Sequence, residues 1–208
     1  MKIKGDKMKF FIASKNKHKI AEFTRILKPL GIELLSESDL ERSLSEVDET
    51  GATFEENAYL KAISAVNETG LPSIADDSGL CVDALDGAPG IYSARFAGEP
   101  ADNQRNNEKL LDLLKNIPQK ERTAKFVCCI VCVFPSGEKV TVRGECPGYI
   151  AENYSGNRGF GYDPLFVSEI GCFGDLTDEQ KDSVSHRGRA LREFSNKIKE
   201  YINGETYA

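Results

Sequence analysis

The chain has 208 residues, 40% hydrophobic and 29% charged, which is typical of a globular protein and excludes a disordered chain. Its formal net charge of −6 repels phosphate backbones and argues against a general nucleic-acid binder. No apolar run approaches the ~20 residues of a membrane span, and the N-terminus lacks the apolar centre of a signal peptide, so we expect a cytoplasmic protein without membrane contact.

Predicted strands and helices alternate along the chain, as short apolar runs give way to apolar residues at helical spacing. Strands are predicted at residues 10–13, 32–35 and 72–75, and helices at residues 17–30, 53–70, 101–116 and 183–202. Residues 126–134 and 139–145 flank a Pro-Ser-Gly-Glu turn and predict a β-hairpin. This order predicts an α/β fold with a mixed β-sheet flanked by helices, and no linker marks a domain boundary.

Six cysteines raise the question of a metal site or of disulfides. Cys129 and Cys132 have C-x-x-C spacing, but they fall in a predicted strand, where side chains alternate between faces. They therefore cannot bind one metal ion together, and we expect reduced cysteines in the core.

The first predicted strand leads into a polar segment, Ser14-Lys-Asn-Lys-His-Lys19, at the start of a helix. Free N–H groups at a helix start, together with lysine side chains, form an anion site, so a phosphate chain is the expected ligand. The alternative is that Ser14 or Asn16 only caps the helix and the lysines face solvent.

The third predicted strand ends at two adjacent carboxylates, Asp76 and Asp77. Because neighbouring residues of a strand point to opposite sides, we expect one carboxylate to face a site and the other to accept hydrogen bonds from loop amides. A homodimeric aspartic protease is an alternative, since it also places Asp-Ser-Gly after apolar residues. The lysines of the other motifs favour a polyanionic substrate instead.

Two further carboxylates, Asp48 and Glu49, precede the second predicted helix, in which Asn57 and Lys61 share one face at i, i+4. Carboxylate and phosphate oxygens are the ligands that Mg²⁺ prefers, so this stretch is a candidate metal site. A solvated acidic loop is the alternative.

The glycine-rich segment at residues 156–164 carries Phe160 and Tyr162, which can stack on a flat ring that the backbone approaches closely. This pattern favours a pocket for a nucleobase. Further along, Lys181, His186 and Arg187 lie at or near a helix start, where their donors suit a base carbonyl or a phosphate. A histidine without function is the alternative for His186.

Six motifs in this order resemble those of the inosine triphosphate pyrophosphatase family, also called the Ham1 or RdgB-like family. They are Ser14-x-Asn16-x-x-Lys19, Glu49-Thr-Gly-x-Thr-Phe-x-Glu-Asn57, Ala75-Asp-Asp-Ser-Gly-Leu80, Gly90-x-x-Ser-Ala-Arg95, Phe160-Gly-Tyr-Asp-Pro164 and Ser185-His-Arg187. The resemblance covers residues 9–202. The residues before it are either an N-terminal extension, at residues 1–8, or an alternative start, and we expect a single domain at residues 9–208. The resemblance also implies an elongated α/β fold with a substrate cleft between two lobes, in a Mg²⁺-dependent, cytoplasmic homodimer.

The activity that this resemblance implies is hydrolysis of ITP, dITP and XTP to the monophosphate and pyrophosphate, which cleanses the nucleotide pool. Asp77 resembles the family's catalytic aspartate and metal ligand, and Asp48 or Glu49 the second metal carboxylate. The residues that resemble its substrate contacts are Ser14, Lys15, Asn16, Lys17, His18, Lys19, Lys61, Ser78, Phe160, Gly161, Tyr162, Asp163, Lys181, His186 and Arg187. Asn157 and Arg158 depart from the family, which often has a small residue there.

The expected mechanism follows from these roles. Asp77 accepts a proton from the attacking water, while the lysines offset the charge of the triphosphate. Arg187 donates to the carbonyl at position 6 of hypoxanthine or xanthine. Arg95 is either a phosphate contact or part of a structural ion pair. A nucleotide sensor without turnover is the alternative, but such a protein has no need of a catalytic carboxylate.

Overall fold

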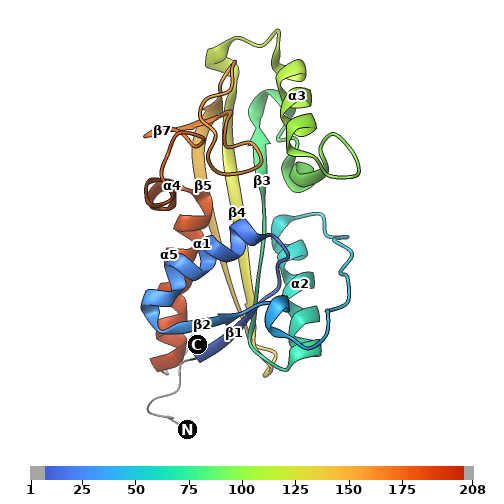
Figure 1. Cartoon of the computed structure of the whole chain (residues 1–208), viewed down its shortest axis with the longest axis vertical. Helices are drawn as coiled ribbons and strands as arrows, with labels where there is room; N and C mark the ends of the chain where they lie inside the picture. The colour runs from blue at the N-terminus through green and yellow to red at the C-terminus, as the bar shows by residue number, and fades with distance from the viewer. Residues whose placement is uncertain (1–7, 204–208) are drawn as a thin grey trace. The chain divides into compact units, whose positions relative to one another are not determined.

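A computed structural model describes residues 8–203, in which seven strands form one sheet in the order β2-β1-β3-β4-β5-β6-β7 (Figure 1). The strands are β1 (Met8–Ile12), β2 (Ile32–Leu35), β3 (Ser73–Val82), β4 (Thr123–Val133), β5 (Lys139–Ile150), β6 (Phe166–Ser168) and β7 (Gly171–Cys172). β1 pairs in parallel with β2 and β3, whereas β6 pairs antiparallel with β5 and β7. The prediction of a mixed sheet is therefore confirmed.

Five α-helices accompany these strands in the described part of the chain, which confirms the α/β class. They are α1 (Lys17–Leu27), α2 (Phe54–Thr69), α3 (Asn103–Leu114), α4 (Asp178–Val184) and α5 (His186–Asn203). Their ends follow the expected signals: the Thr53 hydroxyl accepts from the Glu56 amide at the start of α2, and Gly70 ends that helix with φ +68°. None of the helices within residues 8–203 is both long and apolar enough to cross a bilayer.

The chain folds into two compact units. The first unit comprises the described residues up to Asp77, residues 129–142 and the described residues from Ala190 on; the second comprises residues 78–128 and 143–189. The single domain at residues 9–208 stays a prediction. The expected extension at residues 1–8 lies outside the described residues, except for Met8, which begins β1.

In the first unit, α2 packs against strands through small side chains. Ala58, Ala62 and Val66 of α2 form one buried cluster with Ala75 of β3 and with Val131 and Val133 of β4. Because alanines let the helix approach the strands closely, polar side chains on the same helix reach β3. This packing positions Asn57 and Lys61.

The core of the second unit is aromatic. The Phe126 ring lies with its centroid 4.7 Å from that of Phe166 and 5.9 Å from that of Phe173. Leu80 and Val82 of β3 and Leu110 and Leu114 of α3 belong to the same buried cluster. The segments that carry the expected base pocket are built on this cluster.

Three predicted boundaries were wrong. β5 runs on to Ile150 and does not end at residue 145. β3 does not end at the acidic pair but runs on to Val82, because Leu80 and Val82 beyond the polar residues are fully buried. The predicted final helix is two helices, since Ser185 is extended (φ −65°, ψ 156°) and its hydroxyl accepts from the Gly188 amide at 3.0 Å. The short strands β6 and β7 were not predicted.

None of the six cysteines, which all lie within the described residues, forms a disulfide, as expected. Cys129 and Cys132 are both buried, and burial raises the pKa of the Cys132 thiol far above its usual range. These thiols therefore serve as small apolar core residues.

Candidate active site

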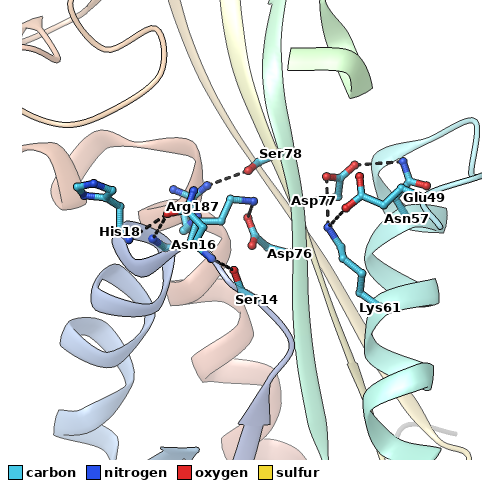
Figure 2. A network of polar contacts seen from close by, with 11 residues as sticks. Ser14, Asn16, His18, Glu49, Asn57, Lys61, Asp76, Asp77, Ser78 and Arg187 are labelled. Carbon is cyan, nitrogen blue, oxygen red and sulfur yellow. Dashed lines mark hydrogen bonds and ion pairs between the residues drawn. The ribbon is translucent and has the colours of Figure 1, made fainter. Parts of the chain in front are cut away.

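The segment between β1 and α1 has a built-in helix cap. The Asn16 side-chain oxygen accepts from the amides of His18 at 3.0 Å and Lys19 at 3.3 Å, and Ser14 Oγ accepts from the Asn16 amide at 3.2 Å (Figure 2). Lys15 and Lys17 are exposed. Asn16 thus fills the capping role that the sequence left open for it.

Lys19 has a different environment from the exposed lysines of this segment. Its ammonium lies 2.9 Å from Asp76 Oδ2, with the lysine side chain 16% exposed and the aspartate side chain 1% exposed. Asp76 was expected to accept from loop amides, because the strand was expected to end there. In the middle of a strand, it forms an ion pair with a lysine of α1.

Asp77 points to the opposite side of β3 from Asp76, toward α2 (Figure 2). Its Oδ1 lies 3.5 Å from Lys61 Nζ, and its Oδ2 accepts from Asn57 Nδ2 at 3.4 Å. Lys61 Nζ also donates to Glu49 Oε1 at 3.0 Å. One strand therefore presents its two carboxylates to two different lysines, and they do not form a shared-proton dyad.

The acidic loop before α2 is folded back onto that helix. The Gly51 amide donates to Asn57 Oδ1 at 2.8 Å, and a Cβ on Gly51 would lie 2.6 Å from Glu56 Cβ, so only glycine fits. This close approach places Glu49 on Lys61. Asp48, in contrast, is exposed.

The charges of this cluster shift the titration of its members. Burial raises the pKa of the Asp77 carboxyl; Lys61 and Lys19 oppose the rise, and Glu49 and Asp76 add to it. Burial alone would lower the pKa of Lys61, but the charges of Asp77, Asp76 and Glu49 outweigh it, so the pKa of the ammonium is raised. Lys61 is therefore charged at neutral pH, and Asp77 is a stronger base than an exposed aspartate.

The carboxylate oxygens of this cluster suit a hard cation that is also bound by the phosphates of a substrate. Within residues 8–203, no three His, Cys, Asp or Glu side chains are arranged to hold a metal by themselves. Glu49 and Asp77 nevertheless both pair with Lys61, and Asp76 pairs with Lys19. Three carboxylates therefore face two ammonium groups. An excess of negative charge with oxygen ligands fits Mg²⁺, which takes one or two carboxylates and completes its shell with phosphates and water.

In the second unit, the segment around Phe160 is a tight turn fastened by Asp163. The Asp163 carboxylate accepts from the Phe160 amide at 2.7 Å and pairs with Lys181 Nζ at 2.8 Å. Gly159 (φ +74°) passes so close that a Cβ there would lie 2.0 Å from Asp163 Oδ2. Lys181 lies 4.7 Å from the centroid of the Phe160 ring. Lys181 thus packs against the segment that the sequence suggested as a nucleobase pocket.

Three further expected residues have distinct positions in this unit. Arg187, 2% exposed, donates to Ser78 Oγ at 2.8 Å and lies 5.9 Å from the centroid of the Phe160 ring. His186 is 4% exposed and stacks on Phe126 with ring centroids 4.7 Å apart. Tyr162 is 4% exposed and belongs to the core cluster.

Arg95 and the unusual pair Asn157 and Arg158 also have defined positions. The Arg95 guanidinium lies 5.3 Å from the centroid of the Tyr92 ring. Asn157 and Arg158 are exposed, and the Arg158 amide donates to the Gly174 carbonyl at 3.0 Å. Their larger side chains therefore point outward and leave the turn intact.

Sequence reasoning missed Asn107, which lies on α3 and donates to the Gly161 carbonyl at 3.0 Å. A signal was present: Asn106 and Asn107 are adjacent in a helix, although asparagine is a poor helix former. Their partners are up to 54 residues away in the sequence, so the pattern alone did not indicate a function.

Comparison with known proteins assigns these features to a family. The family model described as "Ham1 family" matches residues 10–197. The chain belongs to the Ham1 family. It is 50% identical over 203 residues to a dITP/XTP pyrophosphatase of Desulforamulus reducens, covering 95% of this chain and 100% of that protein. It is 53% identical over 182 residues to a dITP/XTP pyrophosphatase of Geobacter sulfurreducens, covering 86% of this chain and 91% of that protein.

A solved structure agrees with the fold. The structure of a HAM1 protein from Coxiella burnetii matches with a TM-score of 0.84 at 36% identity, covering 93% of this chain and 99% of that one. The resemblance drawn from six motifs is therefore confirmed, and the aspartic protease alternative is not favoured.

Proposed function

We propose that this Ham1 protein hydrolyses dITP, XTP and ITP to the nucleoside monophosphate and pyrophosphate, and thereby removes non-canonical purines from the nucleotide pool. The observation that carries the proposal is the buried Asp77 carboxylate, held by Lys61 and Asn57 with Glu49 on the same lysine. The names of the relatives, dITP/XTP pyrophosphatase, support the substrate class.

In this reaction the oxygen of a water molecule bonds to the α-phosphorus, and the bond from the α-phosphorus to the oxygen bridging to the β-phosphate breaks. Asp77 accepts the proton that the water loses. Asn57 and Lys61 fix the orientation of the carboxylate before the substrate binds, so the barrier falls mainly through positioning.

Mg²⁺ is the metal that we assign to Glu49 and Asp77, with Glu49 preferred to the exposed Asp48. When bound, the ion neutralises charge on the phosphate oxygens. Lys19 and Lys61 add two ammonium groups that offset the charge of the triphosphate. The His18 and Lys19 amides are occupied by Asn16, so side chains of residues 14–19, and not these amides, bind phosphate.

Selectivity for the base rests on the second unit. Phe160 stacks on the purine, and Arg187 donates to the carbonyl at position 6, which adenine lacks. With ATP the guanidinium would face a donor and leave a buried hydrogen-bonding group unpaired, a mismatch that costs orders of magnitude in kcat/KM. Asp163 and Lys181 hold the Phe160 segment for this contact. Residues Gly161, Tyr162 and His186 form its support, and Ser78 orients Arg187.

The remaining assignments come from the family resemblance. We propose that the protein acts in the cytoplasm as a homodimer, on purine nucleoside triphosphates and without nucleic-acid or membrane partners. Size-exclusion chromatography with light scattering tests the dimer directly, because a monomeric mass at micromolar concentration contradicts it.

The test of the reaction is release of pyrophosphate from ITP, XTP, GTP and ATP by the parent and by Asp77→Asn. We expect ITP and XTP to be hydrolysed far faster than ATP, and the variant to lose about 10³-fold in kcat, since it keeps the shape of the side chain but loses the base. Binding of ITP without release of pyrophosphate by the parent would support the sensor alternative. An unimpaired variant would refute the assignment of Asp77.

A further inference from the structure

Two adjacent asparagines lie buried in the first half of α3. Asn106 is 2% exposed and Asn107 is 4% exposed. Asparagine is a poor helix former, and a buried amide is costly unless it is hydrogen bonded. Their presence in a helix core indicates that their side chains hold other segments in place.

Asn107 fastens the segment that carries Phe160. Its Nδ2 donates to the Gly161 carbonyl at 3.0 Å. The carbonyls on either side accept from within the segment or just after it: Phe160 O from the Asp163 amide at 3.2 Å, and Tyr162 O from the Leu165 amide at 2.9 Å. The Gly161 carbonyl is thus held from a helix 54 residues away in the sequence.

Gly161 is the residue at which this turn can most easily change shape. It has φ +63°, and a Cβ there would meet no atom within 4 Å, so neither sterics nor packing locks its backbone. A change of ψ at Gly161 would turn the carbonyl away from α3 and shift Phe160, which precedes it, relative to Tyr162. The hydrogen bond from Asn107 opposes that rotation.

Asn106 and Tyr162 form further hydrogen bonds to a second loop, at residues 93–97. Asn106 Nδ2 donates to the Ala94 carbonyl at 2.9 Å, and its Oδ1 accepts from the Ala97 amide at 2.7 Å. The Tyr162 hydroxyl donates to the Ser93 carbonyl at 2.9 Å. One turn of α3 therefore holds the loop around Ser93 and the segment around Gly161 together.

We infer that Asn107 is a positioning residue that sets base selectivity, by holding the Gly161 peptide so that the Phe160 ring keeps its place beside Arg187. The inference rests on the proposed function. The amide donor is the part of Asn107 that matters, because its Oδ1 is buried without a hydrogen-bond partner among the described residues. Leucine, of similar shape, removes the donor and that unsatisfied acceptor together. The Gly161 carbonyl that loses its donor belongs to a partly exposed residue and can accept from water, so Asn107→Leu is expected to fold.

The experiment compares kcat and KM for ITP and ATP in the parent, Asn107→Leu and Leu114→Ala. For Asn107→Leu we expect KM for ITP to rise about 10-fold with kcat little changed, while kcat/KM for ATP changes less than about 2-fold. Leu114→Ala removes a fully buried side chain from the same helix and lowers stability, but it leaves the ratio of ITP to ATP unchanged.

A double-mutant cycle with Gly161→Ala makes the coupling specific. If Asn107 acts through Gly161, the double variant loses no more selectivity than the more affected single variant, so the effects are not additive. Each of three results would overturn the inference: additive losses of selectivity in the double variant, an unchanged ratio of kcat/KM for ITP to that for ATP in Asn107→Leu, or the same loss of selectivity in Leu114→Ala. A parent that hydrolyses ATP as fast as ITP would instead refute the proposed function, and this inference with it.

Discussion

Lys181→Met tests whether the buried ion pair with Asp163 stabilises the turn around Phe160. The two side chains are 7% and 3% exposed and lie 2.8 Å apart, so water does not replace the lost ammonium. Removing one partner of a buried pair costs about 3–5 kcal/mol, because the other charge is left buried. We expect that loss for Lys181→Met, which in a protein of this size lowers Tm by about 6–20 °C.

A second substitution should restore most of the lost stability. Asp163→Asn still offers an oxygen to the Phe160 amide, so a double variant of Asp163→Asn and Lys181→Met buries no charge. Its free energy of unfolding should be within about 2 kcal/mol of that of the parent. Lys115→Met is the matched control: its pair with Asp112 has a similar distance, 2.9 Å, but both side chains are more than half exposed. We expect a change below about 0.5 kcal/mol for that variant.

The assay is urea unfolding followed by far-UV circular dichroism, with thermal unfolding as a second measure. A Lys181→Met variant that unfolds at the same urea concentration as Lys115→Met would refute the argument. So would a double variant less stable than either single one, since that result would assign the loss to packing and not to charge.

Two further predictions concern the metal site. Glu49→Gln should lower kcat/KM for ITP by about 10²-fold and raise the Mg²⁺ concentration needed for half-maximal rate. Asp48→Asn should change kcat/KM less than about 3-fold. Equal effects of the two variants in the pyrophosphate assay would contradict the assignment of the metal to Glu49. Chelation with EDTA should abolish turnover. It should leave the urea concentration at the midpoint of unfolding unchanged, because Lys19 and Lys61 already pair with the carboxylates. A large loss of stability on chelation would instead indicate a structural metal.

Much of the fold could be predicted because its signals are local. The N-cap at Thr53 and the C-cap at Gly70 bound α2 in the sequence as they do in the structure. The end of β3 could not be predicted in this way. Polar residues at 76–78 indicate a turn, but burial of Leu80 and Val82 in the core outweighs that local preference.

The site residues could be gathered from the motifs, but their partners could not. Lys19 and Lys61 both suggest phosphate contacts, and only the structure pairs one with Asp76 and the other with Asp77. In the same way, Lys181 reads as a cation for the triphosphate until its pair with Asp163 is seen. Partner choice depends on which helix packs on which strand, and that information is not local in sequence.

The position of the acidic pair within β3 explains why two adjacent carboxylates are useful. In a strand, consecutive side chains must point to opposite sides, so Asp76 faces the lysine of α1 and Asp77 the lysine of α2 (Figure 2). At a strand end, as the sequence suggested, loop motion would loosen both contacts. Within the strand, the backbone is anchored just before them, where the Ala13 amide of the segment after β1 donates to the Ile74 carbonyl at 2.8 Å. Asp77 is thus oriented before any substrate arrives, and the proposed general base does not depend on the energy of substrate binding for its position.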